Sequence, residues 1–138
     1  MTGFQPYLLI LMRNDMESMT PGRAAAQASH ATSDFTNQME SLLSHTQIEY
    51  KKWKESTTQS FGTTIVVGVD EDQMNLYTDY SRDAYCCGII KDPTYPIRDG
   101  KTTHYVKVDT CAWIFINSPY PISDNPNLFS ELKQLPLF

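Results

Sequence analysis

The stretch SMTPGRAAAQASHATSDF, residues 18–35, decides how this 138-residue chain begins to fold. Its consecutive alanines favour a helix, because alanine has the best intrinsic helix propensity. Thr20 suits the N-cap, and Pro21 suits the first helical position, where a missing N–H costs nothing. The pattern predicts a helix over residues 21–43 whose buried stripe consists of Ala24, Ala28, Ala31, Phe35, Met39 and Leu42.

A polar row follows the same helix on another face. Its members are spaced i, i+4, i+7 and i+11, and they are Arg23, Gln27, His30 and Asp34. A cation in the first turn is unfavourable by about 0.3–1 kcal/mol, because the free N–H groups there attract anions. An anionic ligand would remove that penalty, and Gly22 would let it approach the backbone closely. The other interpretation, a solvated arginine and a packing histidine, stays open on spacing alone.

Short apolar or β-branched runs predict strands at residues 7–12, 63–69, 85–90 and 111–117. Further helices are expected at residues 47–55 and from Asp70 to about residue 84, and a short helix or strand at residues 128–135. Pro93, Pro96 and Gly100 predict a loop over residues 92–100. This order of elements indicates an α/β layered fold in a single domain, residues 1–138.

Charge and composition limit the function. The net charge is -5, with five Lys/Arg against six Asp/Glu in residues 1–60 and six against ten in residues 61–138. Proteins that grip long nucleic acids show a basic face, so any anion site here must be local. Three cysteines, two of them adjacent, form no disulfide framework, and three histidines give no metal-ligand spacing. We therefore expect a soluble, cytoplasmic protein without metal or membrane span.

The segment GRAAAQASHA, residues 22–31, directly after the first strand and its loop, resembles the signature of the type II (archaeal/eukaryotic-type) peptidyl-tRNA hydrolase family. That family typically has G-K-x-A-A-Q-x-x-H-A at this place. Weaker similarities are Trp53 within residues 51–55 before the second strand, VDEDQMNLY (residues 69–77), Ile90-Lys91-Asp92 and the closing LFSELKQLPLF. The resemblance implies a three-layer α/β/α fold with a mixed four-stranded sheet, and a homodimer.

The resemblance also implies a reaction, hydrolysis of the ester that joins a peptide to the 3′ ribose of tRNA, without metal or organic cofactor. The implied catalytic residues are Arg23, Gln27, His30 and Asp92. Arg23 stands at the family's lysine and would neutralise phosphate or oxyanion charge, and Asp92 would orient or deprotonate water. The family's D-A-G-R-T is Asp92-Pro93-Thr94-Tyr95-Pro96 here, so Thr94 is out of register, and Thr110 would replace the threonine only if the fold brings it near.

Three alternatives follow from the altered loop and the residues around it. The same pocket would bind or cleave a small nucleotide, such as a cyclic dinucleotide or an ADP-ribose derivative, with Tyr95 stacked on a base. Residues 50–54 (YKKWK) mix bases with aromatics, which is typical of single-strand binders and also of a solvated helix face with packed aromatics. Finally, the chain would be a dimeric interaction module without a ligand.

Overall fold

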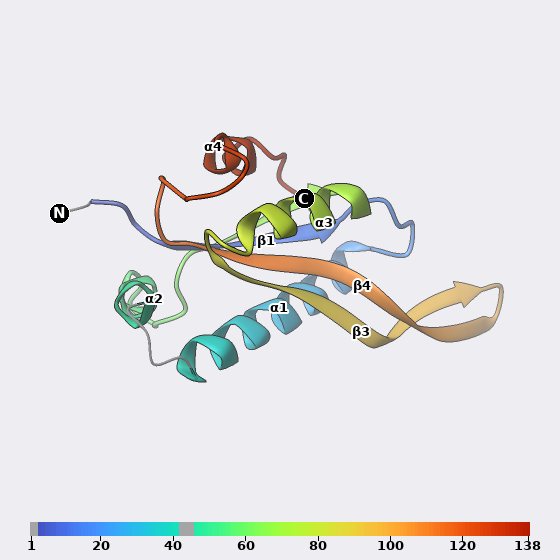
Figure 1. Ribbon diagram of the computed structural model, residues 1–138. Coiled ribbons are helices and arrows are strands. Elements are labelled where there is room, and N and C mark those ends of the chain that lie inside the picture. The colour runs from blue at the N-terminus through green and yellow to red at the C-terminus, as the bar shows by residue number, and fades with distance from the viewer. Residues whose placement is uncertain (1–2, 42–45) are drawn as a thin grey trace.

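The structure, a computed structural model, describes residues 3–41 and 46–138. The strands in these ranges form one sheet in the order β2-β1-β4-β3 (Figure 1). Within it, β1 (Tyr7–Arg13) runs parallel to β2 (Thr64–Val69). The long strand β4 (Thr102–Ile116) runs antiparallel to β1 and to β3 (Cys86–Asp99). The expected mixed four-stranded sheet is confirmed.

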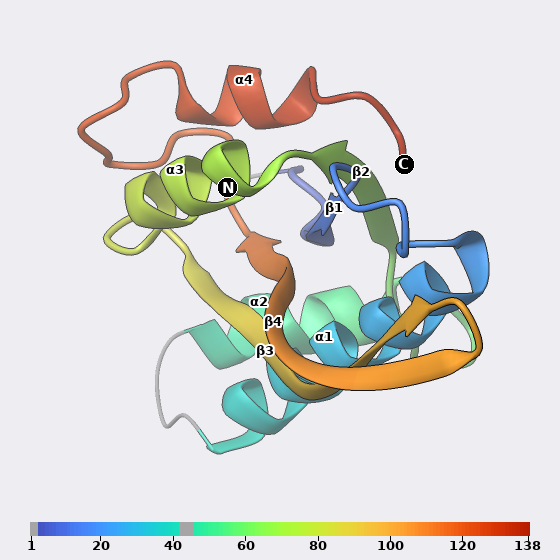
Figure 2. The same ribbon diagram turned by 90° about the vertical axis from the view of Figure 1, so that its right-hand side faces the viewer.

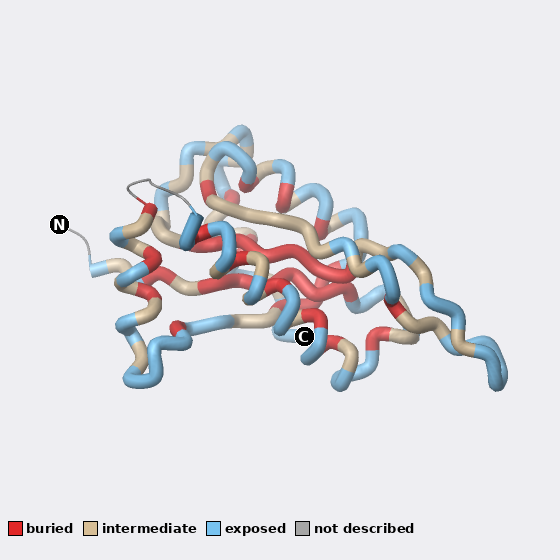
Figure 3. The backbone as a smooth tube through the Cα atoms, turned by 90° about the horizontal axis from the view of Figure 1, so that it is seen from below, coloured by how far each residue is buried: buried red, intermediate tan, exposed pale blue. Residues whose placement is uncertain are grey.

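Helices cover both faces of this sheet (Figure 1). One face carries α1 (Pro21–Ser41) and α2 (Thr46–Glu55), and the other carries α3 (Glu71–Ser81) and α4 (Leu128–Lys133). Figure 3 shows the buried residues gathered along the strands between the helices. Each face has its own apolar core, one around Phe35 and Trp113 and one around Met74 and Leu132. The α/β/α architecture is therefore confirmed.

Helix α1 follows its sequence pattern closely. The Thr20 hydroxyl oxygen accepts a hydrogen bond from the backbone N–H of Arg23 at 3.4 Å, as an N-cap does. Ala28 is only half-buried, and Leu42 and residue 43 lie outside the described residues. The rest of the expected stripe is buried, namely Ala24, Ala31, Phe35 and Met39.

The predicted loop over residues 92–100 is wrong, because this segment continues β3 and pairs with β4 as far as Asp99 and Thr102. Proline lacks the N–H that a ladder needs, but β3 is an edge strand, where Pro93 and Pro96 are tolerated. Gly100 makes the turn with a φ of 60°. The missed signal lies in residues 102–108 (TTHYVKV), which are rich in β-branched and aromatic residues. The resulting hairpin curls out beyond the sheet (Figure 2).

Candidate functional site

Two irregularities in the β3–β4 pairing build the candidate site. Ile90 pairs with Cys111 and Lys91 with Asp109, so Thr110 is an extra residue in β4. A β-bulge of this kind re-aims side chains, and bulges are frequent next to active sites. Consecutive residues here both reach Gln27 of α1. The Thr110 hydroxyl donates to Gln27 Oε1 at 2.7 Å, and the Cys111 thiol donates to the Gln27 backbone carbonyl at 3.6 Å.

The second irregularity shapes the segment that carries Asp92. Asp92 pairs with Val108 and Tyr95 with Val106, so β3 has one residue more than β4 between these pairs. The Asp92 carboxylate closes the bulge by accepting from the backbone N–H of Thr94 at 2.9 Å and from its hydroxyl at 3.3 Å. Its other oxygen, Oδ2, accepts from Gln27 Nε2 at 2.7 Å. The bulge thus turns Asp92 toward α1.

Gln27 connects these groups and is only 3% exposed. Its amide oxygen accepts from Thr110 and its amide nitrogen donates to Asp92, so one neutral side chain holds a hydroxyl and a carboxylate in fixed positions. A buried amide costs free energy unless it is hydrogen-bonded, and this one is bonded at both ends. Both ends of the Gln27 side chain are therefore engaged within the protein, by Asp92 and Thr110.

Asp92 is held as an anion. Burial by itself would raise the pKa of its carboxyl group, but the hydrogen bonds from Gln27 and Thr94 and the nearby His30 lower that pKa below its ordinary value. His30 is exposed on the row of α1 that also carries Gln27. The structure therefore brings together four of the predicted residues, Gln27, His30, Asp92 and Thr110.

Arg23 lies one turn before Gln27 and is half-buried. Its Nη1 donates to the carbonyl oxygen of Ser18 at 2.9 Å, and it has no carboxylate partner among the described residues. It borders a pocket of about 520 Å³ between the β1–α1 loop and the hairpin, lined by Met16, Glu17, Ser18, Arg23, Ile97 and Arg98. The sequence analysis missed Arg98, because it depended on the loop assignment that the structure overturns.

The predicted ligand-binding residues differ in their surroundings. Thr94 is exposed and bonded to Asp92, and a Cβ added to Gly22 would meet open space. Tyr95 is fully buried, and its hydroxyl is 3.1 Å from Ser18 Oγ. The prediction that Tyr95 stacks on a base is therefore wrong in this structure, because its ring packs in the core between the hairpin and the β1–α1 loop.

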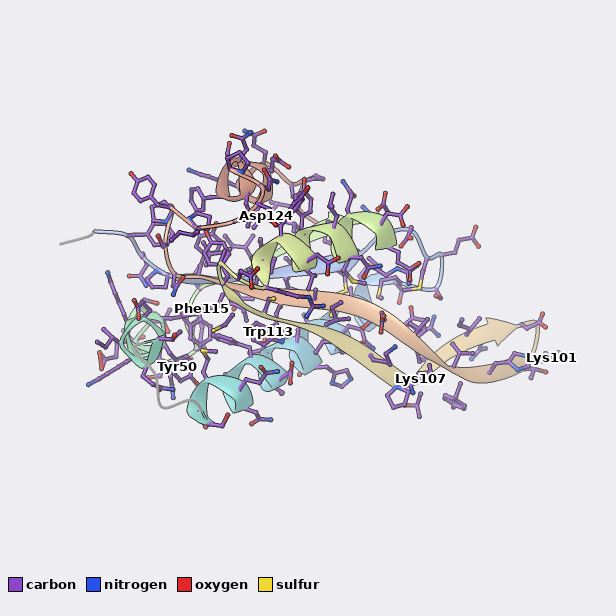
Figure 4. The ribbon with its side chains drawn as sticks, viewed as in Figure 1. Tyr50, Lys101, Lys107, Trp113, Phe115 and Asp124 are labelled. Carbon is purple, nitrogen blue, oxygen red and sulfur yellow. The ribbon has the colours of Figure 1, made fainter. Side chains whose placement is uncertain are left out.

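Asp34, the last member of the polar row, has a structural partner instead. Its Oδ2 accepts from the indole N–H of the buried Trp113 at 2.7 Å. Figure 4 shows Trp113 on the side of the sheet that α1 covers. Asp34 therefore ties α1 to β4, some two turns of helix away from Gln27.

The basic segment of α2 does not join the site. Tyr50 and Trp53 are buried against Phe35, and α2 lies at the C-terminal end of α1, away from Arg23 (Figure 1). Lys51 pairs with Glu55, and Lys54 lies over the Tyr50 ring. The interpretation of a solvated helix face with packed aromatics is the one that the structure supports.

Across residues 3–41 and 46–138, no cluster of three or more His, Cys, Asp or Glu side chains could hold a metal ion. No helix in these ranges is long and apolar enough to cross a membrane.

The groups around Asp92 and Arg23 can activate water and stabilise negative charge. An ionised carboxylate, fixed by an amide and two donors of one threonine, can accept a proton or orient a water molecule. An arginine one turn away, Arg23, can stabilise negative charge. A layered α/β fold with these groups between its first helix and a strand hairpin is a hydrolase-like arrangement.

A comparison with protein families shows to which family the chain belongs. The chain matches the family described as peptidyl-tRNA hydrolase PTH2 over residues 7–135, which is nearly its full length. The chain therefore belongs to the peptidyl-tRNA hydrolase PTH2 family. A search of curated proteins finds no significant match. None of these comparisons supports the alternative of a small nucleotide signal.

Proposed function

We propose that this protein hydrolyses the ester bond between a peptide and the 3′-terminal ribose of tRNA. The observation that carries the proposal is the hydrogen-bonded chain from Thr110 through Gln27 to Asp92, placed beside Arg23 and His30 on α1. Family membership supports the substrate class.

In the proposed reaction, a water oxygen forms a bond to the ester carbonyl carbon and the bond to the ribose oxygen breaks. The products are a free peptide carboxylate and a tRNA with a free hydroxyl, and one proton is released. Oδ1 of Asp92 accepts both hydrogen bonds from Thr94, whereas Oδ2 accepts only the one from Gln27 and has lone-pair capacity left for a water proton. Asp92 would orient that water. Gln27 and Thr110 are positioning residues, because they act through Asp92.

Arg23 supplies charge in this mechanism. An arginine side chain acts as a fixed positive charge, so it would stabilise a phosphate or the developing oxyanion without moving a proton. The family's lysine carries the same charge, and Arg23→Lys is therefore expected to retain turnover. His30, exposed on the same row, would contact the substrate.

The experiment is a hydrolysis assay on a short peptidyl-tRNA with the wild type, Asp92→Asn and Arg23→Ala. Asp92→Asn should lower kcat/KM by about 10²–10⁴-fold, the range for a lost acid–base group. Asp124→Asn is the matched control, because Asp124 is exposed in the segment before α4, across the sheet from α1 (Figure 4). Absence of turnover by the wild type would refute the proposal, and so would full activity of Asp92→Asn.

The proposal includes three expectations about the whole protein: it is one domain, it acts as a homodimer, and it works in the cytoplasm. Sedimentation tests the dimer, which would have twice the chain mass of 15.8 kDa.

A further inference from the structure

The outer part of the β3–β4 hairpin, residues 91–109, stands apart from the sheet. Strand β1 pairs with β4 only between Cys111 and Ile116, so β4 before Cys111 pairs with no other strand than β3 among the described residues. Figures 1 and 2 show this arm projecting past the end of the sheet on the side where α1 begins. A two-stranded ribbon is marginally stable alone, and Tyr95 and Ile97 anchor the base of the arm in the core.

The arm carries a charge opposite to that of the rest of the chain. Residues 91–109 hold four Lys/Arg and three Asp/Glu, a net of +1, whereas the remaining residues hold seven against thirteen, a net of -6. Lys91 pairs with Asp109 at the base of the arm. The other three cations make no ion pair or hydrogen bond with any described residue, and they are Arg98, Lys101 and Lys107. Elsewhere in the described chain, basic side chains have carboxylate, carbonyl or ring partners, as Arg13, Lys52 and Lys133 do.

Two of these cations share a face with an aromatic ring. Side chains alternate along a strand, so Tyr105 and Lys107 lie on the same face of β4, opposite to the face of Val106. Pro96 pairs with Tyr105 and Arg98 pairs with Thr103, which places Arg98 diagonal to Tyr105 on that face. The Tyr105 side chain is conspicuously uncovered, at 68% exposed. Figure 4 shows Lys107 where the hairpin leaves the sheet and Lys101 at its tip.

Arg98 is the residue that connects this face of the arm with the candidate site. Arg98 and Arg23 line one pocket of about 520 Å³, and Glu17 is the acidic residue on its wall. Asp92 pairs with Val108 and therefore lies on the other face of the arm from Tyr105 and Lys107. A single strand held by Lys107 and Tyr105 would pass Arg98 to reach Arg23, which is one helical turn from Gln27. Proteins bind single-stranded nucleic acid with cations that contact successive phosphates and with exposed aromatic rings on which bases stack.

We infer that the β3–β4 arm binds the 3′ single strand of the tRNA, with phosphates at Arg98 and Lys107 and a base on Tyr105. This inference rests on the proposed function, because the ester to be cleaved lies at the end of that strand. A contact of a few nucleotides needs only a local basic surface, so an acidic chain can provide it.

The first test measures binding of deacylated tRNA by fluorescence anisotropy over a salt titration. The double variant Arg98→Gln/Lys107→Gln should weaken binding roughly tenfold, and the slope of log K against log salt should become shallower by about 0.7 for each lost phosphate contact. Tyr105→Ser should weaken binding roughly fivefold or more with the salt slope retained. The matched control is Lys51→Gln/Lys133→Gln, which removes the same charge from helices outside the arm.

The second test compares kcat/KM for peptidyl-tRNA with kcat/KM for the same peptide esterified to a single adenosine. The arm variants should reduce the ratio of the two values about tenfold. If the wild type binds tRNA through the arm but cleaves neither substrate, the inference about the arm is supported and the proposed function is refuted. If the wild type cleaves both substrates and the arm variants bind tRNA as tightly as the control does, the inference about the arm is refuted and the proposed hydrolase activity is retained. A wild type that does not bind tRNA also refutes the arm.

Discussion

Gln27 shows how one neutral side chain can influence the ionisation of another residue, Asp92. A neutral amide has an acceptor and a donor end, and here Thr110 engages the acceptor while Asp92 receives the donor. The orientation of the amide, and therefore the hydrogen bond to the carboxylate, depends on a hydroxyl that does not touch Asp92. The low pKa of Asp92 is in part a property of this chain of contacts.

Replacing Thr110 by valine keeps the shape of the side chain and removes the hydroxyl. Gln27 Oε1 is then buried without a partner, which should cost about 1–3 kcal/mol of unfolding free energy in a urea titration. A less firmly held amide donates more weakly to Asp92, so the pKa of that carboxyl should rise. Activity that needs ionised Asp92 should then be lost at a higher pH as the solution is acidified.

The carboxyl ¹³C shift of Asp92, followed by NMR over pH, measures this pKa without any assay of turnover. Thr110→Ser retains the hydroxyl and should restore the wild-type titration. An unchanged Asp92 titration in Thr110→Val would show that the hydroxyl does not act through Gln27.

At the scale of elements, α1 packs on the sheet at a position where the strand carries a glycine, Gly88. Gly88 of β3 lies beside Trp113, whose indole N–H donates to Asp34 of α1 at 2.7 Å. A Cβ built on Gly88 would lie 2.8 Å from Trp113 Nε1 and 3.1 Å from Asp34 Oδ2. Glycine at this position therefore permits the contact between β3, β4 and α1.

Gly88→Ala should destabilise the protein by about 1–3 kcal/mol, because the fully buried indole cannot move away without strain. Gly22→Ala is the matched control, since its added methyl meets open space and alanine favours the helix by about 0.5–1 kcal/mol. Thermal and urea unfolding of both variants would measure the difference. Equal stability of the two would contradict this account of the α1–sheet contact.

At the scale of the whole molecule, both edges of the sheet are protected, as soluble sheets require. The β3 edge carries Pro93 and Pro96, which cannot donate to a new strand. The β2 edge is covered by residues 136–138, where Gly68 N–H donates to the Pro136 carbonyl at 2.8 Å and Phe138 N–H donates to the Val66 carbonyl at 3.1 Å.

Deleting residues 136–138 should leave the β2 edge open to another chain. We expect a lower melting temperature and association that increases with protein concentration, measured by light scattering. Leu137→Ser is the control, because its side chain is largely exposed and the backbone pairing remains. Unchanged association of the shortened chain would mean that these residues do not protect the edge.

Much of the first half of the fold could be predicted because its signals are local. Helix α1 and its buried stripe depend on a repeat of 3.6 residues, and strand β1 depends on a short apolar run. The same local repeat placed Arg23, Gln27 and His30 in one row, and that row carried the family resemblance. The burial of Gln27 was not predicted, because it depends on which distant segments pack against the helix.

The sequence by itself therefore determined the α/β class, the first helix and the residues that this helix offers to a site. Only the tertiary structure decided that Asp92 and Thr110, which are 65 and 83 residues from Gln27 along the chain, meet at its side chain. It also decided that a proline-containing segment is an edge strand and that Tyr95 is buried. The physical reason is that helical spacing is fixed by neighbouring residues, whereas strand register and bulges depend on pairing between distant segments, which no local pattern specifies.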